Sequence, residues 1–192
     1  MTTVRTFLAI PLPDTLMSYL AWFTDSIRNK LDLINWIKAD NLHITLSFLG
    51  DTKIENIEEH GNALSHCIEK CEPVKLGTTD TGIFPHANDP RVLWVGTAPY
   101  DASFISLAMS IRNGLMELGY HLDNRKFQPH ITLGRVKSIS RKSTFIHDFL
   151  STEVRDTQFV ADEVKWFKST LTPSGAIYEE LETFKLNTGG RI

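Results

Sequence analysis

Hydrophobic and polar positions follow two regular spacings along the chain. Alternation at every second residue is typical of strands, and recurrence every three or four residues is typical of amphipathic helices. Alternation predicts a strand over residues 4–10, and helical spacing from Leu16 to Leu31 predicts a helix with Asp14 as its N-cap. Strand-like alternation resumes over residues 42–49, and Gly50 is expected to end that strand.

The same order of elements returns further along the chain. Strands over 74–83 and 91–97 are separated by FPHANDP, whose prolines predict a loop. Strand, helix, strand, helix, strand therefore occurs twice, which predicts one α+β domain over residues 1–192, with sheets facing each other across a cleft. Its two related halves are approximately 1–84 and 91–186, interleaved in the fold. The other predicted elements are helices over 57–71, 104–118 (stopped by Gly119) and 143–150, strands over 130–136, 159–160, 164–171 and 177–186, and a turn over 172–175.

The tetrapeptide His-Ile-Thr-Leu opens two of these strands. Because side chains alternate across a strand, His43, Thr45 and Ser47 are expected on one face, and the neighbouring apolar residues, Phe48 included, on the core face. His130 and Thr132 form a second polar pair by the same rule. One such pair is typical of a solvated sheet face. Two pairs brought together by pseudo-symmetry would surround one point with two imidazoles and two hydroxyls.

Charge and cysteine content limit the classes of protein to which the chain could belong. The formal net charge of -3 over 192 residues argues against a generally basic surface that holds nucleic acid along its length. Between Asn124 and His147, however, there is no carboxylate and there are several Lys and Arg residues. The two cysteines, Cys67 and Cys71, do not suggest a disulfide framework and favour a reducing, cytoplasmic location. No apolar run is long enough to predict a membrane span.

Paired histidines suit general acid–base catalysis. An unperturbed imidazole has a pKa of about 6.5, so near neutral pH one ring can accept a proton while the other donates one. Threonine hydroxyls beside them can donate hydrogen bonds to oxygens that carry charge in a transition state. This set of groups favours cleavage of a phosphodiester.

Five sequence features in order resemble one known family. They are RTFLAIPLP, NWIKADNLHITLSFLG, GIFPHANDPRVLWVG, PHITLGRV and the HxTL pair that the second and fourth of these contain. The chain resembles the 2H phosphoesterase superfamily and, within it, the bacterial and archaeal RNA 2′,3′-cyclic phosphodiesterases, also called 2′-5′ RNA ligases. The resemblance implies a bilobal, pseudo-symmetric α+β fold with two antiparallel sheets lining a central cleft and helices outside.

The resemblance also implies an activity and roles for residues. The activity is hydrolysis of a 2′,3′-cyclic phosphate at an RNA end to a 2′-phosphomonoester, with reversible 2′-5′ ligation as a related reaction. His43 would be the proton donor and His130 the proton acceptor, while Thr45 and Thr132 would hold the non-bridging oxygens. Arg135 also matches a family position near the cleft, and it could contact phosphate only if Gly134 allows the strand to bulge. Phe7 and the Trp36 region match family positions near the cleft as well, where their rings could stack on a base or pack in the core.

Neither a cofactor nor a metal is expected, since no third ligand accompanies His43 and His130. The expected partner is RNA with a 2′,3′-cyclic phosphate end or a small nucleotide. The protein is expected to be a monomer and not to associate with a membrane. Arg125 and Lys126 could form a basic lip that meets RNA, or an ordinary solvated loop. The alternatives are another 2H phosphoesterase that acts on small cyclic nucleotides or 2′-5′ oligonucleotides, and a non-catalytic protein that binds RNA ends.

Overall fold

The structure is a computed structural model, and it describes residues 2–28, 32–122, 127–140, 143–173 and 175–189. Its strands are β1 (Thr3–Pro11), β2 (Leu33–Trp36), β3 (His43–Lys53), β4 (Val74–His86), β5 (Asp89–Pro99), β6 (His130–Ser138), β7 (Gln158–Ala161), β8 (Glu163–Thr172) and β9 (Gly175–Lys185). Its helices are α1 (Asp14–Ile27), α2 (Ile57–Ile68), α3 (Ser103–Glu117) and α4 (Phe145–Ser151), with short 3-10 turns η1 (Ala39–Asn41) and η2 (Ile54–Asn56).

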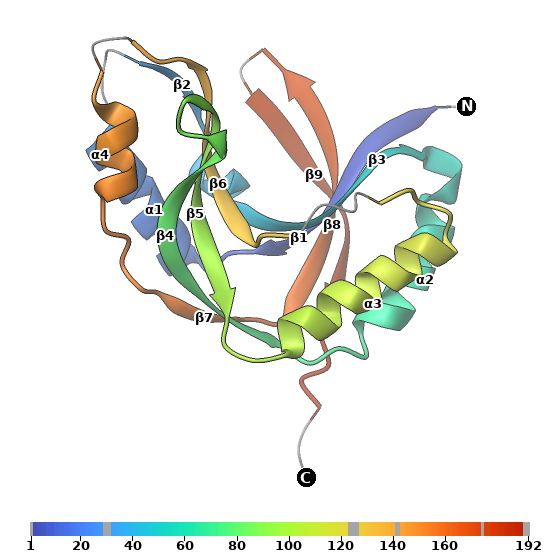
Figure 1. The fold of residues 1–192 in the computed structure, drawn as a ribbon. Helices are drawn as coiled ribbons and strands as arrows, with labels where there is room; N and C mark the ends of the chain where they lie inside the picture. The colour runs from blue at the N-terminus through green and yellow to red at the C-terminus, as the bar shows by residue number, and fades with distance from the viewer. Residues whose placement is uncertain (1, 29–31, 123–126, 141–142, 174, 190–192) are drawn as a thin grey trace.

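All the strands belong to one antiparallel sheet, in the order β7-β4-β5-β6-β3-β1-β8-β9, with β2 paired to β6. The two sides of this sheet meet where β6 and β3 pair through a single register position, Ile44 with Ile131. We call β7-β4-β5-β6 with β2 the β6 wing, and β3-β1-β8-β9 the β3 wing. The α+β class and the antiparallel arrangement are confirmed, and the two predicted sheets are two wings of one curled sheet (Figure 1).

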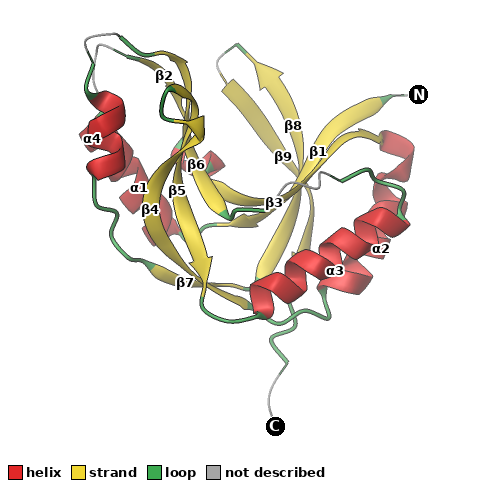
Figure 2. Cartoon of the chain, in the orientation of Figure 1, coloured by secondary structure: helices red, strands yellow, loops and turns green. Residues whose placement is uncertain are grey.

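The helices lie on the outside of the wings. Figures 1 and 2 show α1 and α4 outside the β6 wing and α2 and α3 outside the β3 wing. Their apolar stripes bury residues such as Leu16, Leu64 and Leu107 against the sheet, each fully inaccessible to solvent. The sheet face that bears these helices is therefore the core, and we call the opposite face, which the two wings turn toward each other, the open face.

Most predicted elements are present, but several boundaries differ. Asp14 is the first residue of α1 and not its cap; Pro13 holds the N-cap position without a side-chain hydrogen bond. The strand β3 continues past Gly50 to Lys53, because Gly50 adopts φ +70° at a register shift and pairing then resumes. In contrast, Gly119 does end the helix region as expected, with φ +82°.

The prediction that FPHANDP forms a loop between two strands is wrong. Phe84 pairs with Val92 and Pro85 with Pro90, so β4 and β5 extend to a tight turn. A register shift next to Pro85 accommodates residues that lack a backbone N–H. The strand β2 was not predicted, since its four residues form a strand only by pairing with β6. The predicted turn over 172–175 and helix end at Leu31 each include a residue outside the described part of the chain.

No helix in the described residues is long and apolar enough to cross a membrane.

Candidate active site

The two His-Ile-Thr-Leu motifs meet at the junction of the wings. Ile44 and Ile131, which occupy the same place in the two motifs, pair with each other and are fully buried on the core face. Antiparallel pairing around this position places His43 across from Thr132 and Thr45 across from His130. The four polar side chains therefore share the open face, and each histidine lies next to the other motif's threonine.

A bulge interrupts each motif strand at the leucine of the motif. In β3, Thr45 pairs with Ala9 and Ser47 with Leu8, so Leu46 is skipped. In β6, Thr132 pairs with Trp94 and Gly134 with Leu93, so Leu133 is skipped. Each bulge reverses the alternation that follows it.

The bulge in β3 overturns one prediction and the bulge in β6 supports another. Ser47 pairs with the core-facing Leu8 and leaves the face of His43, whereas Phe48 pairs with Phe7 and lies on the open face, 63% exposed. Strict alternation was therefore wrong for Ser47 and Phe48. In β6 the same geometry carries Arg135 to the face of His130 and Thr132, because Arg135 pairs with Val92, two residues before Trp94 on β5.

Both imidazole rings are anchored in the same way. The Nδ1 of His43 lies 2.7 Å from the carbonyl oxygen of Asn41, and the Nδ1 of His130 lies 2.7 Å from that of Gln128. A carbonyl only accepts, so each Nδ1 carries the proton and donates. Each Nε2 is left for chemistry. In His43 this atom lies 3.1 Å from the Thr45 hydroxyl oxygen.

The electrostatic environment lowers both histidine pKa values. Burial lowers the pKa of His43, its bond to the Asn41 carbonyl raises it, and the charges on His130 and Arg135 lower it further. Burial also lowers the pKa of His130, against the Gln128 carbonyl, and the charge on Arg135 adds to the lowering. Since Arg135 acts on both rings, its guanidinium belongs to the same electrostatic site.

Aromatic rings surround His43 on the β3 wing. Its ring centroid lies 5.0 Å from that of Phe7 and 5.4 Å from that of Tyr178, which approaches edge-on. Phe7, which matches a family position near the cleft, lies beside His43, yet only 3% of it is exposed. The Asn41 side-chain amide donates to the Ala176 carbonyl at 3.1 Å, which ties the start of β9, and hence Tyr178, to the residue that anchors His43.

Different aromatic residues surround His130. The ring of Phe84 lies 5.0 Å away and edge-on, and that of Trp94 lies 6.0 Å away. A Cβ on Gly82 would lie 2.0 Å from the Trp94 indole, so only glycine lets the indole lie against β4. Trp36, in contrast, pairs with Gly134 on the core-facing register, packs edge-on against Phe145 at 6.1 Å, and is partly buried against the core.

His43 and His130 are partly buried. The described hollows lie away from them, between or beside α2 and α3; one, of about 230 Å³, is lined by Cys67 and Gly114 among others. Within the described ranges, no three His, Cys, Asp or Glu side chains are grouped as metal ligands would be. Arg125 and Lys126, the predicted basic lip, lie outside the described residues.

The chain is similar to known proteins over most of its length. The family model for LigT-like phosphoesterases matches residues 10–94 and again 95–178, so it covers most of the chain in two consecutive copies. The chain belongs to the LigT-like phosphoesterase family. This confirms the family resemblance inferred from the sequence.

Relatives in this family are similar over nearly their full length. The RNA 2′,3′-cyclic phosphodiesterase of Methanocaldococcus jannaschii is 33% identical over 181 residues, 93% of this chain and 99% of the relative. The protein of the same name from Archaeoglobus fulgidus is 32% identical over 191 residues, 95% of this chain and 100% of the relative.

Solved LigT-like structures share the fold. A crystal structure of a Thermus thermophilus protein has a TM-score of 0.78 at 26% identity, covering 96% of this chain and 100% of that one. E. coli LigT complexed with 3′-AMP has a TM-score of 0.76 at 22% identity, covering 96% of this chain and 99% of that one.

Sequence reasoning missed three residues of this LigT-like site: Phe84, Trp94 and Tyr178. Each lies on a strand other than the motif strands, and reaches a histidine through sheet pairing or curling. Apart from their aromatic character in predicted strands, no local pattern marks them. The pairing of β4, β5 and β6 brings Phe84 and Trp94 to the site. The pairing of β1, β8 and β9 and the bond between Asn41 and Ala176 bring Tyr178 there.

Proposed function

We propose that this chain hydrolyses 2′,3′-cyclic phosphate ends of RNA to 2′-phosphomonoesters by acid–base catalysis between His43 and His130. The observation that carries the proposal is the junction of the two motifs, where two identically anchored imidazoles share one face with two threonines and Arg135. The activity named for relatives at 32% and 33% identity, each covered almost completely, supports the same substrate class.

In the proposed reaction, the neutral Nε2 of His130 accepts a proton from water. The water attacks phosphorus in line with the bond to the 3′ oxygen, and the protonated Nε2 of His43 donates its proton to that departing oxygen. One P–O bond forms and one breaks, and one proton is taken up while another is released. The product carries a 2′-phosphate and a 3′-hydroxyl. No group other than the chain's own residues and water takes part.

The lowered pKa values fit a division of labour. Because a charge on His130 disfavours a charge on His43, the pair holds one proton more readily than two. A bound phosphodiester anion opposes this lowering, since an opposite charge stabilises an imidazolium. Binding of the substrate would therefore place one proton on the pair, as an acid and a base require.

The remaining residues would hold the phosphate. Thr45 and Thr132 would donate hydrogen bonds to the non-bridging oxygens, and the Arg135 guanidinium would offset their charge. Phe7 stays a proposed substrate contact; its burial against His43 favours a role in positioning that ring.

The test is product identification. We expect the protein, in excess chelator, to convert a short RNA with a 2′,3′-cyclic end into a product with a 2′-phosphate, resistant to enzymes specific for 3′-phosphates. An RNA with a plain 3′-hydroxyl is the control and should not change. Formation of a 3′-phosphate, or no reaction with chelator followed by reaction when Mg²⁺ or Zn²⁺ is added, would contradict the mechanism.

Three alternatives are separated by the same assay. Faster turnover of small cyclic nucleotides or of 2′-5′ oligonucleotides would assign a different substrate within the family. Tight binding of the cyclic-ended RNA without turnover would indicate an RNA-end-binding protein. Joining of an RNA with a 5′-hydroxyl, which would attack phosphorus in place of water, would reveal 2′-5′ ligation, in which His130 and His43 keep the roles of base and acid.

We also propose that the chain consists of two related halves, approximately 1–84 and 91–186, interleaved within one domain. Two consecutive matches to one family model support this, as do the matching bulges at Leu46 and Leu133. A monomeric state and a cytoplasmic location stay predictions, the latter based on the free thiols Cys67 and Cys71.

A further inference from the structure

The open face of the β3 wing continues beyond the histidine. Along β3 it carries Phe48, Asp51 and Lys53, which pair with Phe7, Arg5 and Thr3 on β1. These residues follow from the same register that places His43 and Thr45 on this face. The surface is therefore continuous with the proposed catalytic site.

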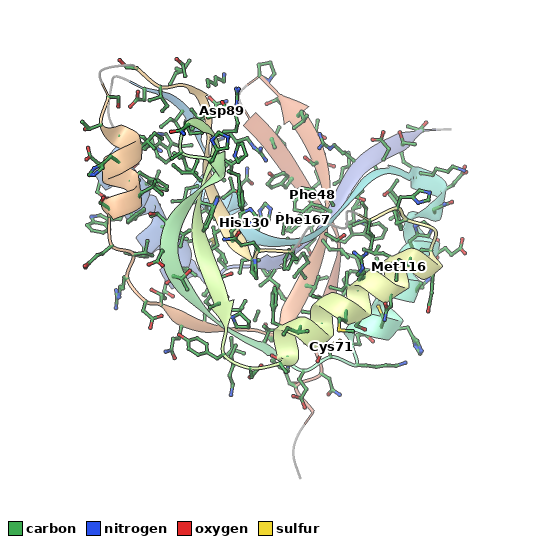
Figure 3. The ribbon with its side chains drawn as sticks, viewed as in Figure 1. Phe48, Cys71, Asp89, Met116, His130 and Phe167 are labelled. Carbon is green, nitrogen blue, oxygen red and sulfur yellow. The ribbon has the colours of Figure 1, made fainter. Side chains whose placement is uncertain are left out.

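Phe48 is the most unusual of these residues. It is 63% exposed although its ring lies only 6.0 Å from that of Phe7, at the edge of an aromatic cluster that includes Phe167 and Tyr178. Figure 3 shows Phe48 and Phe167 between the wings, where His130 also lies, while Met116 lies among the outer helices. An exposed ring supported from beneath by other rings is a suitable platform for a nucleobase.

Cations lie past this platform. Arg5 and Lys53 are exposed on the open face, and neither forms an ion pair with another described residue. Arg5 is near enough for its charge to act on Tyr178, at the other side of the aromatic cluster. One carboxylate, Asp51, lies opposite Arg5. Of the charged residues that β1 and β3 themselves place on this part of the open face, two are positive and one is negative.

We propose that Phe48, Arg5 and Lys53 form a subsite for the nucleotide on the 5′ side of the cyclic end, with Phe48 stacking on its base and the two cations binding its phosphate. The subsite rests on the proposed function and adds to it a binding position for the nucleotide that precedes the cyclic end, so that an RNA strand of two or more nucleotides is preferred to a single cyclic nucleotide. The strand then runs from the two motifs outward over β3 and β1, away from the β6 wing.

The experiment compares kcat/KM for a trinucleotide with a 2′,3′-cyclic end and for adenosine 2′,3′-cyclic phosphate. Wild-type protein should prefer the trinucleotide. Phe48→Ala should lower the ratio of the two kcat/KM values on the order of tenfold, because one stacked base is lost, and Phe48→Tyr should restore it. Trp22→Ala is the matched control, since Trp22 is 65% exposed on α1 and should leave the ratio unchanged.

The cations are tested by salt dependence. In the double variant Arg5→Gln with Lys53→Gln, the slope of log kcat/KM for the trinucleotide against log salt should become shallower by about 0.7 for each phosphate that the variant no longer binds. Asp51→Asn removes the negative charge opposite Arg5 and should raise the ratio of kcat/KM for the trinucleotide to kcat/KM for adenosine 2′,3′-cyclic phosphate. Arg91→Gln is the control, because Arg91 is exposed on the other wing and ion-paired with Asp89.

Two outcomes would overturn the subsite. One is an equal loss for both substrates in Phe48→Ala, which would mean that Phe48 serves the terminal nucleotide or the fold. The other is an unchanged ratio and salt slope in the Phe48 and cation variants. Failure of the proposed function looks different, since wild-type protein would then turn over neither substrate.

Discussion

The β3 and β6 wings contain the same tetrapeptide, His-Ile-Thr-Leu, in the same geometry, but the residues that surround it differ between the two wings. In both, the histidine is anchored by the carbonyl two residues earlier, and the strand bulges at the motif leucine. In both, the fifth residue after the histidine turns onto the open face. That residue is Phe48 in one wing and Arg135 in the other.

This difference shows how a tetrapeptide that occurs twice can build an asymmetric site. Both wings have a bulge that turns one side chain onto the open face. The residue that it exposes is an aromatic ring on one side and a cation on the other. The proposed RNA substrate would use both, because it is itself asymmetric, with a charged phosphate at its end and nucleobases on one side only.

The largest expected effect separates the two histidines. His43→Ala and His130→Ala should each lower kcat for a cyclic-ended RNA by about 10²- to 10⁴-fold, the usual contribution of a general acid or base. On an activated nitrophenyl phosphodiester, whose leaving group needs no proton, His43→Ala should recover much of its loss and His130→Ala should not. Steady-state rates on both substrates check this. Equal recovery by both variants would show that the roles are not divided as proposed.

An intermediate effect is expected at Arg135. Burial and, to a smaller extent, the charge of Arg135 lower the pKa of both histidines. Because kcat/KM requires one protonated and one neutral ring, its maximum should lie below pH 6.5. Arg135→Gln removes a positive neighbour, which favours each imidazolium, so both pKa values should rise and the maximum should move to higher pH. The maximum itself should fall by on the order of ten- to a hundredfold.

The control for this prediction is Arg135→Lys, which keeps the charge and loses the bidentate geometry. The kcat/KM of Arg135→Lys should reach its maximum at the same pH as that of the wild-type protein, but the maximum should be lower. An Arg135→Gln profile that peaks at the wild-type pH would mean that the guanidinium does not share the electrostatic site.

The smallest effect should distinguish the two threonines. Thr45→Val and Thr132→Val each remove a hydroxyl of nearly the same shape and should lower kcat/KM about fivefold, as for one hydrogen bond of about 1 kcal/mol. The Thr45 hydroxyl also lies 3.1 Å from Nε2 of His43, the atom that donates the proton in the proposed reaction. Only Thr45→Val should therefore shift the pH dependence of kcat/KM as well as lower its maximum. A shift of the same size in Thr132→Val would remove the distinction.

Much of the candidate site could be predicted from the sequence because its chemistry is local. His43 and Thr45, like His130 and Thr132, lie two residues apart on strands whose period places them on one face. The same rule failed just beyond the motifs, at Ser47 and Phe48, where a single extra residue reverses the alternation. A bulge is set by the partner strand, so local alternation carries no sign of it.

The sequence by itself determined the α+β class, most of the helices and strands, and the two pairs of polar residues, because periodic burial and the chemistry of a tetrapeptide are properties of neighbours along the chain. The tertiary structure alone decided that Ile44 pairs with Ile131, that Arg135 and Phe48 turn onto the open face, and that Phe84, Trp94 and Tyr178 surround the histidines. These features depend on which strands lie side by side and in which register. Hydrogen bonds between residues distant in the sequence set that register, and a shift of one residue in it changes the face on which every later side chain lies.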